Sequence, residues 1–125
     1  GGKLRDIGCR RGNRPQSSRL TLMAAFRVQD AAGRRLDEIY VYTRDTWGEA
    51  QADRYIRALF AQFEAIATRD AAWRVIPAEF GVDGYYCRFE HHYIYWRVLN
   101  DGAVGIVTIL HERMHQMDRF REDQP

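Results

Sequence analysis

The sequence predicts an α+β fold: an N-terminal strand and an antiparallel pair of helices packed on a small antiparallel β-sheet. Two stretches of helical periodicity lie close together between residues 30 and 68. From residue 85 onward, apolar and polar side chains alternate as they do in strands. The 125 residues fit one domain, and an apolar content of 46% is enough for a hydrophobic core.

The first elements expected are a strand over residues 25–29 and a helix that follows it. Asp30 is predicted to cap this helix, because its carboxylate can accept hydrogen bonds from the free N–H groups of the first turn. Apolar or small side chains then recur at helical spacing, at Leu36, Ile39, Tyr40 and Thr43. The helix is expected to end at about Arg44 or Asp45.

A second helix is predicted from Glu49 to about Thr68, after an interruption at Gly48. Thr46 and Glu49 have the spacing of a capping box, in which each side chain binds the other's backbone N–H. Arg54 is expected on the outer face. The buried face carries Ala52, Tyr55, Ile56, Leu59, Phe60, Phe63 and Ile66. So short a link makes the two helices an antiparallel hairpin.

Residues 70–84 are expected to be irregular, and three strands follow, over residues 85–90, 92–99 and 103–110. The turn at residues 100–102 reads Asn-Asp-Gly, a hairpin signal because glycine adopts positive φ without strain. The tail at residues 113–121 is predicted to be either a final helical turn or a disordered end. The element order is therefore β-α-α-β-β-β.

Charge is distributed unevenly along the chain. Residues 1–22 hold six basic residues and one acid, a net +5, whereas residues 23–125 hold 13 arginines and 16 acids, a net −3. We interpret residues 1–22 as a flexible basic leader and Met23 as the start of the folded domain. A mildly acidic body is not typical of a general nucleic-acid-binding protein.

No apolar stretch is long enough for a membrane helix and no signal sequence is evident, so we expect a cytoplasmic protein without membrane contact. Cys9 and Cys87 belong to no Cys-x-x-Cys pair, which argues against a structural zinc site. Reduced thiols are expected in the cytoplasm, so a disulfide between them is disfavoured. Cys87, in a strand pattern, is expected to be a small buried side chain.

Residues 111–115 read His-Glu-Arg-Met-His, the His-Glu-x-x-His pattern of zinc proteases. That chemistry needs both histidines on one helical face and a third ligand. The preceding residues predict a strand and no histidine follows His115, so we interpret the pattern as a chance match without metal. His91 and His92 are adjacent on a strand and face opposite ways, so we expect one half-buried and one solvated.

Arg88, Arg97 and Arg113 come from three strands or their ends and could converge on a phosphate or carboxylate. The alternative is cross-strand pairing with Glu90 or Glu112. Several aromatic residues interleave with these arginines and could form a platform for stacking bases, a patch covered by a partner, or simply core. They are Tyr85, Tyr86, Tyr93, Tyr95 and Trp96.

Over about residues 24–118 the chain resembles the ParE toxins of the RelE/ParE superfamily. The residues that carry the resemblance are Trp47, Gly48, Glu49, Ala52, Tyr55 and Ile56, then Gly84, Tyr85, Arg88, His92, Ile94, Tyr95, Arg97 and Val98, and then residues 109–114. They occur in the order found in the family. The resemblance implies the RelE/ParE-like fold, with the helical hairpin packed on the sheet.

The resemblance implies a toxin of a type II toxin–antitoxin system, neutralised by a ParD-like antitoxin. ParE toxins inhibit DNA gyrase without catalysing a reaction, so no catalytic residue and no cofactor is expected, and DNA contact is expected only through the antitoxin complex. The RelE branch instead cleaves mRNA in the ribosome. This chain has Lys3 as its only lysine and no tyrosine after Tyr95, unlike that branch. An mRNA endonuclease and a non-toxic antitoxin-binding relative are the alternatives.

The antitoxin is expected to dock an amphipathic helix along the helical hairpin and the sheet edge. Its binding site is predicted to combine aromatic anchors with two arginines, at Trp47, Trp73, Phe80, Tyr85, Arg88 and Arg97. The C-terminal segment at residues 113–120 is a second candidate surface. Residues predicted to act on the toxin's target are His111, Arg113, Met114 and His115.

Overall fold

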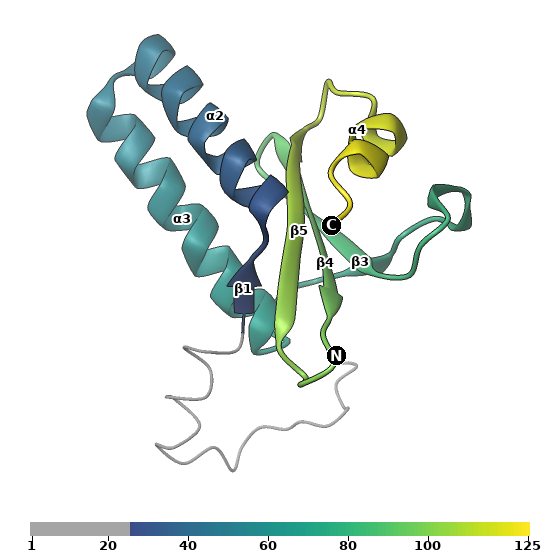
Figure 1. Cartoon of the computed structure of the whole chain (residues 1–125). Helices are drawn as coiled ribbons and strands as arrows, with labels where there is room; N and C mark the ends of the chain where they lie inside the picture. Colours follow the sequence, from purple (N-terminus) through teal and green to yellow (C-terminus); the bar gives the residue numbers. More distant parts are fainter. Residues whose placement is uncertain (1–25) are drawn as a thin grey trace, which may run out of the picture.

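The computed structural model describes residues 26–125; the expected leader, its boundary at Met23 and Cys9 lie outside this part. The elements are β1 (Phe26–Val28), α2 (Asp30–Trp47), α3 (Glu49–Ala67), β2 (Arg74–Val75), a 3-10 turn (Ala78–Phe80), β3 (Tyr85–Phe89), β4 (His92–Val98), β5 (Val104–His111) and α4 (Gln116–Glu122). Figure 1 shows α2 and α3 as one layer beside the sheet, with α4 on the other side of β5. The α+β fold is confirmed.

The sheet has five strands in the order β1-β5-β4-β3-β2. Strands β2 to β5 pair antiparallel, as expected, but β1 pairs with β5 in parallel, so the sheet is mixed. Two residues in the segment expected to be irregular form β2 and extend the sheet beyond β3. The hairpin turn before β5 is confirmed, with Gly102 at φ 87°.

The predicted helix caps are wrong. Gln29 holds the N-cap position of α2 without a side-chain hydrogen bond, and Asp30 is already the first helical residue. The capping box does not form because α2 continues through Trp47, which keeps Thr46 helical rather than in the extended conformation of an N-cap. Gly48, at φ 99°, makes the reversal between the helices instead.

Two hydrophobic cores lie on opposite faces of the sheet. The larger one joins the helical hairpin to the sheet and includes Leu36, Leu59, Phe63, Ile94 and Trp96. The smaller one lies under α4 and the 3-10 turn and includes Ile76, Tyr95, Leu110 and Phe120. Strand β5 is buried from Val104 through Leu110 because both cores cover it.

A bulge in β5 helps both cores to share this strand. Trp96 pairs with Ile106 and Tyr95 pairs with Thr108, so Val107 has no partner in β4. Ile106 packs in the core under the hairpin, while Val107 packs in the core under α4. Beyond the bulge the alternation of side chains is shifted by one position, so Ile109 again packs in the core under the hairpin and Leu110 in the core under α4.

The C-terminal tail is ordered, and of the two predicted states the helical one is observed. Phe120 of α4 is 1% exposed and packs against Tyr95 and Phe80, at ring centroid distances of 5.1 and 5.4 Å. Residues 113–120 therefore cannot act as a surface as a whole, since Phe120 is part of the core. None of the helices in residues 26–125 has the length and apolar character required to cross a membrane.

The expectation for Cys87 is confirmed, since its side chain is buried in the core under the hairpin. Burial raises the pKa of its thiol to about 11, and the amide of Gln62 lies 3.8 Å from the sulfur. A thiol with so high a pKa stays protonated at neutral pH and reacts slowly.

Candidate functional site

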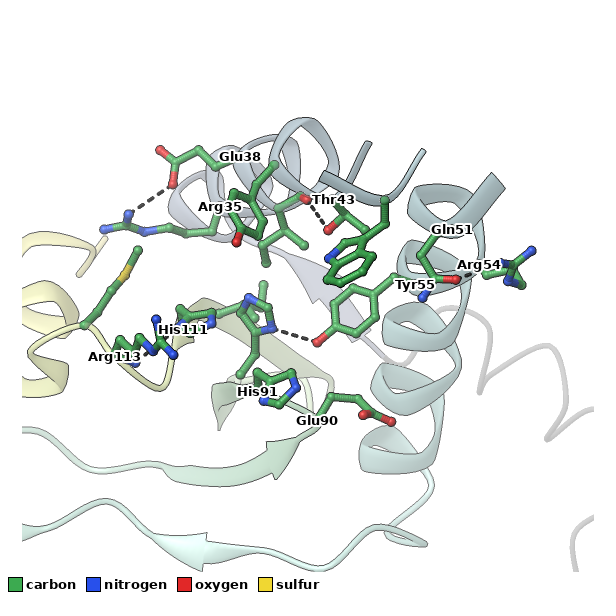
Figure 2. A pocket seen from close by; sticks show the side chains of 16 residues that line it. Arg35, Glu38, Thr43, Gln51, Arg54, Tyr55, Glu90, His91, His111 and Arg113 are labelled. Carbon is green, nitrogen blue, oxygen red and sulfur yellow. Dashed lines mark hydrogen bonds and ion pairs between the residues drawn. The ribbon is translucent and has the colours of Figure 1, made fainter. Parts of the chain in front are cut away.

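A groove of about 1000 Å³ separates the tip of the helical hairpin from the end of the sheet. Figure 2 shows α2 and α3 above and beside it and the strand ends below. The lining residues from the helices are Arg35, Glu38, Ile39, Tyr42, Thr43, Trp47, Gln51, Arg54 and Tyr55. Those from the sheet and the segment after β5 are Glu90, His91, His92, Ile109, His111, Arg113 and Met114.

The hairpin side of the groove carries two unusually exposed aromatic side chains. Trp47 is 70% exposed and Tyr42 is 66% exposed, although both are large and apolar. Both belong to the C-terminal half of α2, and Trp47 is its last residue. Exposed aromatic residues beside a hollow are typical of a site that a partner covers.

The floor of the groove holds three histidines beside Tyr55. The Tyr55 hydroxyl and His92 Nδ1 lie 2.7 Å apart, and the His111 ring packs edge-on against His92 with centroids 5.1 Å apart. His91 stacks on His111 from the solvent side, at 6.4 Å. The contact is possible because β3, β4 and β5 end together at this side of the sheet.

Two side chains of the floor, His92 and Tyr55, are uncharged at neutral pH. Burial lowers the pKa of His92 to about 4, helped by the neighbouring His111 and His91. Burial also raises the pKa of Tyr55 to about 12, with a further contribution from the charge of Glu90. The uncharged rings of His92 and Tyr55 suit an apolar side chain of a partner better than a charged one.

The outer rim near the β3–β4 turn is polar. Glu112 binds Arg88 through one carboxylate oxygen and His91 through the other, the latter at 3.0 Å. The hydrogen bond to His91, which is the largest influence, and the charge of Arg88 lower the pKa of Glu112. Arg88 also donates to the carbonyl of Glu90. Arg88 is expected either to converge with other arginines on an anion or to pair across strands with a glutamate. The structure shows the second, with Glu112 as the partner.

Four of the predicted site residues line the groove: Trp47, His111, Arg113 and Met114. Trp47 is predicted to bind the antitoxin and the other three to act on the toxin's target, yet all four line the same groove. Arg88 lies just outside it, bound to the rim residue Glu112.

The other predicted site residues lie elsewhere. Trp73 packs on Tyr85, and Tyr85 on Trp96, near the β2 edge of the sheet. Phe80 packs in the smaller core. Arg97 neighbours Gly105 on β5, four residues along β4 from the partner of Arg88, or roughly 13 Å. A convergence of Arg88, Arg97 and Arg113 on one anion is therefore wrong.

The two histidines of the His-Glu-x-x-His pattern do not share a helix. His111 ends β5, and His115 occupies the N-cap position of α4, where its ring accepts from the backbone N–H of Asp118. A turn separates the two. The geometry that metal binding by this pattern requires is absent.

Of the 16 residues that line the groove, 12 are not among the predicted site residues, and these include Arg35, Tyr42 and Arg54. Arg54 is expected on the outer helix face, but in the structure it lines the groove and donates a hydrogen bond to Gln51. An aromatic residue such as Tyr42 on the exposed face of a helix could have indicated a binding surface. Its position opposite the strand ends depends on how far α2 extends past the sheet, and helical periodicity contains no such information.

The family model for the ParE toxin of the type II toxin–antitoxin system parDE matches residues 26–116. The chain belongs to the ParE toxin family. Within this family it is 32% identical to Toxin ParE of Escherichia coli over 100 residues, which cover 80% of this chain and 96% of that protein.

Two further ParE relatives match most of their length. Toxin ParE1 of Caulobacter vibrioides is 33% identical over 94 residues, covering 74% of this chain and 94% of the relative. Toxin ParE1 of Mycobacterium tuberculosis strain H37Rv is 28% identical over 95 residues, with the same coverage. This ParE-family chain is thus the toxin of a type II toxin–antitoxin system, which implies an antitoxin as its partner.

Proposed function

We propose that the groove between the helical hairpin and the sheet is where the antitoxin binds, through an amphipathic helix of a ParD-like protein. The observation that carries the proposal is the pair of exposed rings, Tyr42 and Trp47, beside a groove of about 1000 Å³. An α-helix with its side chains is about 10–12 Å wide and typically docks in such a groove through its apolar face.

The lining defines the chemistry of the helix that would fit. Apolar side chains of the antitoxin would contact Trp47, Ile39 and Met114 and lie over the neutral His92. Acidic side chains would meet the exposed Arg54 and Arg113 at the two sides. Trp73, Phe80, Tyr85 and Arg97 lie away from the groove and have no part in this docking mode.

Two arginines of α3 allow a matched test of this site. Arg54 and Arg57 are both exposed on the same helix, but only Arg54 lines the groove. We expect Trp47→Ala to weaken antitoxin binding by about 30-fold or more, Arg54→Ala by several-fold, and Arg57→Ala not at all. Isothermal titration with the purified antitoxin measures these affinities. Equal affinities of the Trp47→Ala variant and the unmodified toxin would rule out the groove.

We further propose that the toxin inhibits DNA gyrase. Membership of the ParE family supports this, and the role implies that the protein acts in the cytoplasm, where gyrase works on DNA. The antitoxin would contact operator DNA, and the toxin would reach DNA only within that complex. Neutralisation follows if the antitoxin covers toxin residues that gyrase needs.

Assays with purified toxin distinguish gyrase from mRNA as the target. We expect it to block supercoiling of relaxed plasmid by gyrase, and the antitoxin to restore supercoiling at equimolar concentration. A cell-free translation reaction run in parallel should proceed with intact mRNA. Cleaved mRNA with normal supercoiling would instead identify an mRNA endonuclease, and no effect in either assay would identify a non-toxic relative.

A further inference from the structure

Arg35 of α2 lines the groove and also reaches the C-terminal end of the chain. Its Nε donates to Asp123 at 2.8 Å and its Nη2 donates to the same carboxylate at 3.3 Å. In Figure 2 the side chain runs from α2 toward the yellow C-terminal ribbon. One arginine therefore connects the wall of the groove to the residue that follows α4.

This ion pair is largely shielded from water, and its carboxylate accepts three hydrogen bonds. The side chains of Arg35 and Asp123 are 12% and 8% exposed, and the buried hydroxyl of Thr108 donates to Asp123 at 2.8 Å. A buried carboxylate that loses its partners is costly, so the three groups stay together while α4 is docked. The pair thus fixes the guanidinium group as well as the helix end.

The guanidinium group still has a free edge. Asp123 occupies the side formed by Nε and Nη2, while Nη1 donates only to Glu38 at 3.1 Å. The Glu38 side chain is 61% exposed, and an exposed pair of this kind is weak and easily exchanged. A carboxylate from a partner in the groove can therefore bind the free edge without displacing Asp123.

We propose that Arg35 couples the groove to the C-terminal helix: Asp123 and Thr108 orient its guanidinium toward an acidic side chain of the bound antitoxin. The coupling is reciprocal, so the bound antitoxin holds α4 more firmly against the sheet. Neutralisation then includes fixing the C-terminal segment in place as well as covering the groove. This inference rests on the groove being the antitoxin site.

The test is Asp123→Asn in the full chain, which removes the charge that holds Arg35 but touches no groove residue except Arg35. We expect antitoxin affinity, measured by isothermal titration, to fall about tenfold. In hydrogen exchange, the backbone amides of residues 116–122 should become better protected when the antitoxin binds the unmodified toxin. They should gain little protection in the variant.

Glu122→Gln is the matched control, because it removes an acid one residue earlier whose side chain is 61% exposed. Its affinity and protection should equal those of the unmodified toxin. Should Asp123→Asn unfold the protein, Arg35→Lys keeps the charge but loses the two-pronged contact, and Thr108→Val removes only the hydroxyl. Both should weaken antitoxin binding in the same direction.

The outcomes separate this inference from the function proposed above. If Trp47→Ala weakens antitoxin binding while Asp123→Asn, Arg35→Lys and Thr108→Val leave affinity unchanged, the groove site stands and the coupling is overturned. If Trp47→Ala has no effect, the groove is not the antitoxin site, and both proposals fail.

Discussion

At the scale of single residues, the contact between Tyr55 and His92 shows how packing keeps a histidine of the groove uncharged. His92 contacts Tyr55 from α3 and His111 from β5, so its imidazole has little access to water. Removing water disfavours the charged form, and two neighbouring histidines disfavour it further. His92 therefore stays neutral at a pH where an exposed histidine is half protonated.

The lowered pKa of His92 predicts a loss of stability in mild acid. The unfolded chain takes up a proton on this histidine near pH 6.5, but the folded protein does so only near pH 4. Between these values the unfolded state binds more protons, so the free energy of unfolding decreases as the pH falls through that window. We expect Tm to drop by several degrees between pH 7 and pH 4.5.

His92→Gln isolates this contribution, because glutamine does not titrate but can accept from the Tyr55 hydroxyl. The change of Tm with pH should be smaller in this variant than in the unmodified protein. His115→Gln is the control, since the His115 side chain is 68% exposed and its replacement should leave the pH profile as it was. Identical profiles for His92→Gln and the unmodified protein would contradict the assignment.

At the scale of elements, Gly84 shows how closely β3 approaches its neighbours. Its φ is +155°, and an added Cβ would lie 2.8 Å from the carbonyl oxygen of Trp96 and 2.9 Å from Ile76 Cδ1. The first of these atoms is backbone and cannot move aside without disturbing β4. The start of β3 therefore requires glycine.

We expect Gly84→Ala to lower the free energy of unfolding by about 2 kcal/mol. Gly33→Ala is the matched control: nothing lies within 4 Å of its added Cβ, and alanine should stabilise α2 by up to about 1 kcal/mol. Urea denaturation measures both. A Gly84→Ala variant as stable as the unmodified protein would show that the backbone of β4 at Trp96 can shift at little cost.

Periodicity predicted the strands and both helices to within about three residues, because each has one regular apolar face. It could not predict β2, whose two exposed residues have no pattern to detect. The capping box failed for a related reason, since Thr46 and Glu49 have the right spacing but Thr46 remains helical. The spacing of residues shows which local structures a segment can form, and packing in the folded protein determines which of them it adopts.

At the scale of the whole molecule, the groove is the feature that the sequence could not reveal. Its walls come from residues 35–55 and from residues 90–114, which meet only in the folded protein. The family resemblance indicated a partner and the docking of a helix along the hairpin. It did not indicate that Arg113 and Trp47 face the same space, because that depends on the angle between the hairpin layer and the sheet.

The parallel pairing of β1 with β5 has a consequence for synthesis. Phe26 pairs with Val104, so β1 can join the sheet only after β5 has been synthesised. His111 and Met114, which form part of one wall of the groove, also come from this late stretch. The sheet and the groove beside it are consequently completed only after the last strand has been synthesised.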